Sequence, residues 1–334
     1  MVNLAVDRSA PPENMMRPRP AEVWLNTSRS ASSPPRTPQP WEWRPAAAYG
    51  GPPMWFSTAF TIGDKAFIGT GYSARNEFWQ YDSGRDAWTR KADYPGKTRG
   101  AAIAFAIGGK GYLGLGYGDN ERFADLWEYD PSADRWTQKA SLPAAVRDHC
   151  VVFAIGAKAY VAGGMTCKAN EEDCGDLKEV WEYVPRADRW TRKSDMPEPI
   201  IWSGYFVLNG KGYIGAGPRQ QTFTRRVWEY DPQADTWTRK ADFPGRGRFR
   251  AVGFSLDGKG YIGTGIAAMG DKTAEVLNDL WEYDPQANAW TPAPAFSGPA
   301  RGAAVGFVLG SRVYIGTGTN SGRTLLRDFW WAGQ

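Results

Sequence analysis

Histidine is almost absent from this chain of 334 residues, because His149 is the only one. Metal sites built from several imidazoles are therefore excluded, and a Ser/His/Asp catalytic arrangement would have to use His149 itself. No metal or other cofactor is expected. The chain also contains no apolar run close to the roughly 18 residues of a membrane-spanning helix, so no membrane span is expected.

An excess of charge of one sign is also missing. Forty Lys and Arg residues face 36 Asp and Glu residues, and the resulting net charge of +4 is spread along the chain. A nucleic-acid partner would call for a clustered basic surface, so nucleic-acid binding is not expected.

Cysteine is scarce, with three residues in all. Cys150 lies in an apolar stretch and is expected to be a small buried residue. Cys167 and Cys174 fall in the longest predicted loop, and two interpretations stay open for them. They form a disulfide, which would indicate an oxidising compartment, or they are two free thiols.

Residues 1–40 differ in composition from the rest of the chain. They are rich in Pro, Ser and Arg and poor in apolar residues, so a disordered tail or linker is expected, followed by one domain over residues 41–334. No secretory leader is visible at the start. The compartment stays open: cytoplasmic if Met1 is the natural start, and extracytoplasmic if a leader is missing.

What the chain has in abundance is an internal repeat. Near copies of Trp-Glu-Tyr-Asp-Pro recur with anchoring tryptophans at positions 79, 127, 181, 228, 281 and 330, and each is preceded by a strand that ends in a glycine doublet such as Gly263-Thr264-Gly265. Trp281 and Tyr283 lie two residues apart and project from one face of a strand, and Asp284-Pro285 predicts the turn that follows. The doublets precede loops and strands, never a helical pattern, so a dinucleotide-binding loop is not indicated. We expect them to allow close approach between neighbouring blades.

A four-stranded unit of about 50 residues with glycine doublets and paired aromatic residues resembles the kelch repeat of β-propellers. The resemblance covers residues 41–331 and implies an all-β, six-bladed propeller of the galactose-oxidase-like kelch superfamily, of the type found in bacteria. The sixth copy lacks its last strand. Because Trp41-Glu42-Trp43-Arg44-Pro45 matches Trp290-Thr291-Pro292, we expect an N-terminal strand to complete the C-terminal blade and close the ring.

All variation in loop length falls on one face of the predicted propeller, which makes that face the candidate binding surface. One position of the connection between blades, just before the innermost strand, carries four arginines: Arg99, Arg147, Arg248 and Arg301. Two interpretations stay open. Each arginine donates hydrogen bonds to loop carbonyls, or the four together form a pocket that binds an anion. The kelch resemblance adds weight to the second, because related propellers use such arginines for acidic peptides or sugar acids.

Residues beside this position add aromatic and polar groups at the expected channel mouth. The candidates are Trp55, Asp148, His149, Trp202 and Arg250. An amphipathic ligand with one anionic end would suit such a set, and the alternative is that the aromatic side chains simply fill the channel.

These features favour a monomeric, non-catalytic scaffold that recognises a protein or glycan ligand through the loop face, and an anionic ligand is one form that this expectation takes. The alternative is a sugar-acid mutarotase or another carbohydrate-active enzyme, similar to the bacterial six-bladed kelch mutarotase for sialic acid, with Asp148, His149 or Glu198 as acid or base. The copper-radical oxidases of the superfamily need two histidine ligands, which this chain lacks.

Overall fold

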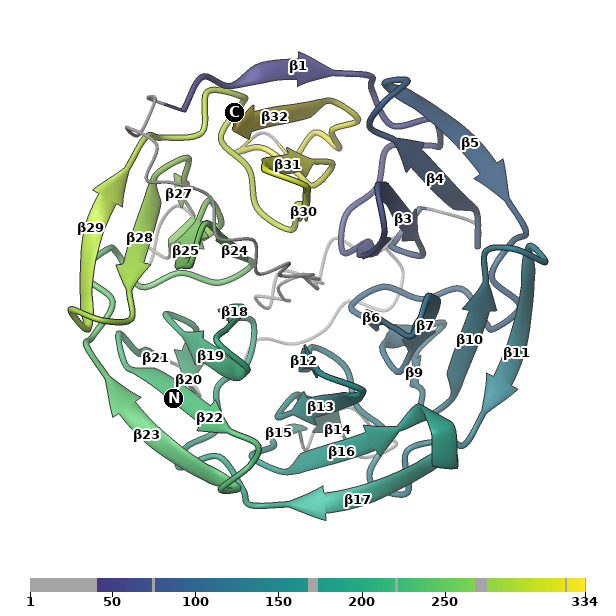
Figure 1. Ribbon diagram of the computed structural model, residues 1–334, viewed down its shortest axis with the longest axis horizontal. Helices are drawn as coiled ribbons and strands as arrows, with labels where there is room; N and C mark the ends of the chain where they lie inside the picture. The colour runs from purple at the N-terminus through teal and green to yellow at the C-terminus, as the bar shows by residue number, and fades with distance from the viewer. Residues whose placement is uncertain are drawn as a thin grey trace, which may run out of the picture.

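Six four-stranded antiparallel sheets surround a central axis in the computed structural model of the chain (Figure 1). The structure describes residues 41–333 apart from 74–75, 168–173, 220–221, 268–274 and 322. The predicted tail over residues 1–40 lies outside the described residues. The predicted six-bladed propeller is confirmed, and no helix in the described part of the chain has the length and apolar character needed to cross a membrane.

In blades 1 to 5 the strands run outward from the axis in chain order. Blade 1 contains β2 (Thr58–Ile62), β3 (Lys65–Gly69), β4 (Phe78–Asp82) and β5 (Ala87–Lys91). Blade 2 contains β6 (Ile103–Ile107), β7 (Lys110–Gly114), β10 (Leu126–Asp130) and β11 (Arg135–Lys139). Blade 3 contains β12 (Val151–Ile155), β13 (Lys158–Ala162), β16 (Val180–Val184) and β17 (Arg189–Lys193), with a 3-10 turn, η1 (Pro185–Ala187), before β17.

The remaining three blades repeat this arrangement. Blade 4 contains β18 (Gly204–Leu208), β19 (Lys211–Gly215), β22 (Val227–Asp231) and β23 (Thr236–Lys240). Blade 5 contains β24 (Val252–Leu256), β25 (Lys259–Gly263), β28 (Leu280–Asp284) and β29 (Ala289–Ala293). Blade 6 contains β30 (Val305–Leu309), β31 (Arg312–Gly316), β32 (Phe329–Gly333) and, at its outer edge, β1 (Arg44–Ala46).

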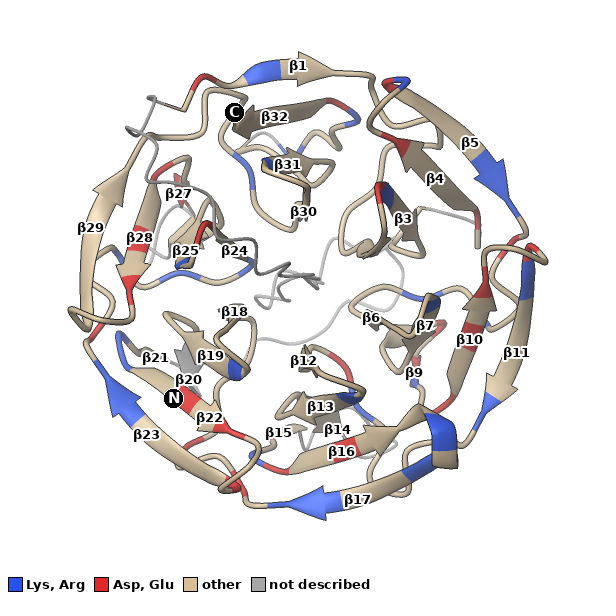
Figure 2. Ribbon diagram, in the orientation of Figure 1, with Lys and Arg blue, Asp and Glu red and all other residues tan. Residues whose placement is uncertain are grey.

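The inner strands form the core and the outer strands face solvent. All five residues of β24 are buried, whereas β29 contains only half-buried and exposed positions. Lys and Arg residues accordingly decorate the outer strands β5, β11, β17 and β23 (Figure 2). The second aromatic residue of the repeat joins adjacent blades, because its indole N–H donates to a backbone carbonyl of the preceding connection, as Trp136 does to Ala92 at 2.9 Å.

The ring closes through β1, as the sequence predicts. β1 pairs antiparallel with β32, and Pro45 lies opposite Trp330, just as Pro292 lies opposite Trp281 in blade 5. The ladder begins only at Arg44. The two preceding tryptophans pack across the junction with blade 5, Trp41 against Tyr261 (4.9 Å between ring centroids) and Trp43 against Phe296 (4.9 Å).

The glycine doublets serve the geometry of the blades. Gly116 has a φ of 95°, and a Cβ atom there would lie 2.7 Å from the carbonyl oxygen of Gly100 in the same blade. Its amide donates to the carbonyl of Arg147 in the next blade at 3.0 Å. A left-handed conformation, close approach within a blade and a hydrogen bond between blades therefore all explain the doublet.

Candidate functional site

The loop face carries short β-hairpins where the sequence pattern indicates only loops. They lie between the second and third strands of blades 2 to 5: β8–β9 (Tyr117–Gly118 and Glu121–Arg122), β14–β15 (Met165–Cys167 and Cys174–Asp176), β20–β21 (Pro218–Arg219 and Thr222–Phe223) and β26–β27 (Ile266–Ala267 and Glu275–Val276). Backbone bridges tie three of them to the connection that enters their blade, for example Asp148 to Met165. The opposite face has tight turns. The loop face is therefore the one that carries additional secondary structure, in the form of these hairpins.

The four predicted arginines are braces inside their own blades. Each is at most 1 % exposed. Arg248 donates from Nε to the carbonyl of Arg246 (3.0 Å), from Nη1 to that of Thr264 (3.0 Å), and from both terminal nitrogens to the carboxylate of Asp279 (2.6 and 2.7 Å). Arg99, Arg147 and Arg301 repeat this pattern with Asp125, Glu179 and Asp328. These contacts occupy the N–H groups of the four guanidiniums and leave little donor capacity for a ligand.

The acidic partner in each brace also accepts the indole N–H of the anchoring tryptophan two residues later. Trp281 donates to Asp279 at 2.8 Å, and Trp127 donates to Asp125 at 2.9 Å. An acidic residue two positions before the repeat tryptophan thus accompanies all four arginines, and it also occurs in blade 1 as Glu77, where Met54 replaces the arginine.

Blade 4 makes the same brace with the charges exchanged. Ile200 stands at the arginine position, and Glu198 accepts from Arg226 (2.7 Å) and from the indole of Trp228 (2.9 Å). Glu198 is thus committed to a structural ion pair, which removes the reason for considering it as a catalytic acid or base. In blade 1 the arginine position is Met54, which is fully buried.

The Arg248 brace has a consequence for acid stability. Burial raises the pKa of Asp279, but the hydrogen bonds from Arg248 and Trp281 outweigh it and hold the pKa below its usual value. Because the folded-state pKa lies below that of the unfolded chain, the stabilisation is present above about pH 4 and is lost as pH falls through the folded-state pKa.

The variant Asp279→Asn is therefore expected to show a smaller fall of its urea midpoint than the unaltered chain between about pH 5 and about pH 3. Asp242→Asn, which removes an exposed carboxylate, is the matched control, and an equal slope in both variants would contradict the expectation.

Six residues in the left-handed conformation surround the propeller axis on the loop face, a region called the channel mouth below. They directly follow the connection between blades and have φ values from 55° to 64°: Phe56, Ala101, His149, Trp202, Arg250 and Ala303. Their backbones bond around the axis, as when the amide of His149 donates to the carbonyl of Ala101 (3.2 Å) and that of Arg250 to Trp202 (2.9 Å). This ring holds the neighbouring side chains at fixed positions, and the spacing of the repeats carries no signal for its strained φ values.

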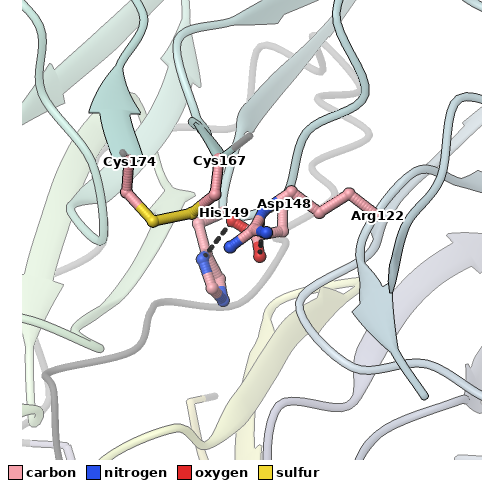
Figure 3. Close-up of a disulfide and its surroundings, with 5 residues drawn as sticks. All are labelled: Arg122, Asp148, His149, Cys167 and Cys174. Atoms are coloured by element: carbon pink, nitrogen blue, oxygen red, sulfur yellow. Dashed lines mark ion pairs between the residues drawn. A yellow bond between two sulfur atoms is a disulfide. The ribbon is translucent and has the colours of Figure 1, made fainter. Parts of the chain in front are cut away.

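A buried charge cluster lies at this mouth (Figure 3). Nδ1 of His149 lies 2.7 Å from Oδ1 of Asp148, and Nε of Arg122 lies 3.2 Å from Oδ2 of the same carboxylate. All three side chains are at least nine-tenths buried. Arg122 comes from β9 and is not a predicted site residue. The backbone bridge from Asp148 to Met165 connects this cluster to the β14–β15 hairpin, whose Cys167 and Cys174 are joined by a disulfide.

Aromatic rings surround the remaining predicted residues. The guanidinium of Arg250 lies 4.5 Å from the ring centroid of Phe56, 5.3 Å from that of Trp55 and 5.2 Å from that of Phe249. His149 lies between Phe56 and Trp202, at 6.1 and 5.9 Å between ring centroids. The structure thus brings Trp55, His149, Trp202 and Arg250 into one cluster, and their binding role stays a prediction.

Known structures support the fold. The solved structure of YjhT superposes with a TM-score of 0.76 over 85 % of this chain and 95 % of that chain, at 19 % sequence identity. This chain shares the six-bladed propeller fold. At that identity the likeness shows the fold alone. No family model and no curated protein matches the chain, and the described residues contain no cluster of three or more His, Cys, Asp or Glu side chains arranged to hold a metal ion.

Proposed function

We propose that the protein is a non-catalytic, kelch-type binding module that recognises an anionic group of a protein or glycan ligand at the channel mouth of the loop face. The observation that carries the proposal is the position of Arg250, held over three aromatic rings, one of which, Phe56, also contacts His149 of the Asp148–His149 pair. A cation stacked on aromatic rings is fixed in orientation and partly shielded from water, which strengthens its attraction for an anion.

The indole of Trp202 adds a donor to this site. Its N–H group is buried and has no hydrogen-bond acceptor among the described residues. A buried donor without an acceptor costs stability, so an anionic oxygen that reached this N–H would offset that cost. Trp55 is half-buried and supplies an apolar surface next to Arg250. The combination suits a ligand with one anionic end and an apolar body.

A second candidate function, sugar-acid mutarotation, is favoured by the contact between Asp148 and His149. A histidine oriented by a carboxylate is a common general base, and proton transfer at an anomeric centre needs one. The two functions differ in one measurable respect. A mutarotase speeds the exchange between sugar anomers observed by NMR and loses this effect in His149→Gln, whereas a binding module leaves the uncatalysed exchange rate unchanged.

The binding proposal predicts the behaviour of Arg250→Gln. In a calorimetric titration with acidic sugars and acidic peptides, this variant is expected to bind the recognised ligand about tenfold more weakly, since a charge-assisted hydrogen bond is lost. Arg239→Gln, on an exposed outer strand, is expected to keep the affinity of the unaltered chain. Equal affinity of the Arg250 and Arg239 variants, or no binding of any acidic probe, would contradict the proposal.

A further inference from the structure

The six repeats provide an internal standard against which a specialised junction between blades can be recognised. At every junction the carbonyl of one residue accepts a backbone amide of the connection to the next blade, and a second residue lies two positions before the arginine or equivalent ring residue. In order from junction 1/2 to junction 6/1 these pairs are Asn76 and Lys97, Ala124 and Ala145, Lys178 and Glu198, Arg225 and Arg246, Asn278 and Pro299, and Arg327 and Pro52. Only the junction between blades 4 and 5 places two arginines together.

A hollow of about 390 Å³ lies at this same junction, on the loop face. Its lining consists of Phe223, Arg225, Pro244, Gly245, Arg246 and Gly247. Both charged residues of the lining are cationic. The floor is aromatic, because Phe223 stacks on Phe249 at 6.0 Å between ring centroids, and Phe249 in turn contacts Arg250 at the channel mouth.

Arg225 is fixed at the edge of the hollow. Its Nε donates to the carbonyl of Phe243 (2.8 Å) and its Nη2 to that of Pro244 (2.8 Å). Its Nη1 donates to no described residue, and Arg225 is exposed to solvent. Arg225 is therefore held by the backbone of the connection to blade 5, and it retains donor capacity for an anion.

Arg246 is held more loosely. Its ion pair with Glu275 is exposed, with 46 % and 48 % of the two side chains accessible, and such pairs contribute little to stability. The flanking residues, Gly245 and Gly247, are the only case among the six junctions of a glycine on both sides of this position. A Cβ atom on Gly247 would lie 2.5 Å from Cβ of Phe223, so the absence of a side chain lets the connection pack against this ring.

We infer that the hollow between blades 4 and 5 is a carboxylate subsite. Arg225 and Arg246 bind the carboxylate, and Phe223 contacts the ring body that bears it. The arrangement suits a sugar acid, whose ring C–H groups pack on an aromatic face, and equally a carboxylate on an aromatic ring. The inference rests on the proposed function in one respect, namely that ligands are bound on the loop face.

The test is a ligand-observed NMR titration with D-glucuronate, benzoate and D-glucose. Both carboxylates are expected to bind and the neutral sugar is not; binding of one carboxylate alone would identify the ring type of the ligand. Arg225→Gln and Arg246→Gln are each expected to weaken binding by about fivefold to tenfold. Glu275→Gln is expected to strengthen binding by about twofold to threefold, because it removes the competing carboxylate.

Arg327→Gln is the matched control, since Nε and Nη2 of Arg327 both donate to the carbonyl of Tyr49, the counterpart of Phe243, at a junction without a second arginine. Melting temperatures identify any variant that is merely destabilised. If Arg225→Gln is destabilised, the affinity of Arg246→Gln decides whether the hollow binds the carboxylate, because that variant breaks only an exposed pair. Equal affinities in the Arg246, Glu275 and Arg327 variants would overturn the inference. That result does not affect the channel-mouth proposal as long as Arg250→Gln weakens the binding of the ligand recognised there. Failure of this inference and failure of the proposed function are therefore distinguishable.

Discussion

Deletion of residues 1–45 is expected to lower the stability of the propeller by roughly 5 kcal/mol and its melting temperature by roughly 10 °C. The truncation removes the Arg44–Trp331 and Pro45–Trp330 pairs of the ladder, so β32 becomes an exposed edge strand. It also removes Trp41 and Trp43, which pack against Tyr261 and Phe296 across the junction with blade 5. Differential scanning calorimetry measures the change.

Deletion of residues 1–38 is the control for this experiment. It keeps Trp41, Trp43 and β1, so its melting temperature is expected to match that of the full chain. The longer truncation is also expected to aggregate more readily, because an open blade edge offers unpaired N–H and C=O groups to a second molecule. Identical melting temperatures for the two truncations would refute the role of β1 as the closing strand.

The architecture was predictable from the sequence because it is periodic. The anchoring tryptophans set the number of blades, and the match of Trp43-Arg44-Pro45 to Trp290-Thr291-Pro292 predicts the closing register that the structure shows, Pro45 opposite Trp330. Identical units bury identical faces, so each copy repeats the same physical argument.

The site was less predictable because it consists of departures from the repeat. The hairpins β8–β9 and β26–β27 have two residues in each strand, too few for alternation to be visible. Arg122 reaches Asp148 from such a hairpin, and no spacing within the repeat relates the two residues. The arginine braces were predictable in principle from the acidic residue two positions before each tryptophan, as with Asp279 and Trp281.

Arg248→Met is expected to destabilise the protein by about 3 kcal/mol, because it leaves buried carbonyl groups and one carboxylate without their donor. The carbonyls of Arg246 and Thr264 and the carboxylate of Asp279 all lose a bond. Methionine occupies the equivalent position in blade 1, as Met54, so the side chain itself is compatible with the fold. Arg239→Met, which breaks only an exposed pair with Asp242, is expected to change stability by less than about 0.5 kcal/mol in the same urea titration.

This variant also separates the two interpretations of the arginines. If they are braces, Arg248→Met lowers the urea midpoint while the folded protein keeps its affinity for the acidic ligand, whereas Arg250→Gln weakens the binding of that ligand. Stability depends on bonds within the blade, whereas affinity depends on donors that face the loop surface. An Arg248→Met protein as stable as the unaltered chain that no longer binds the ligand would return the four buried arginines to the role of an anion pocket.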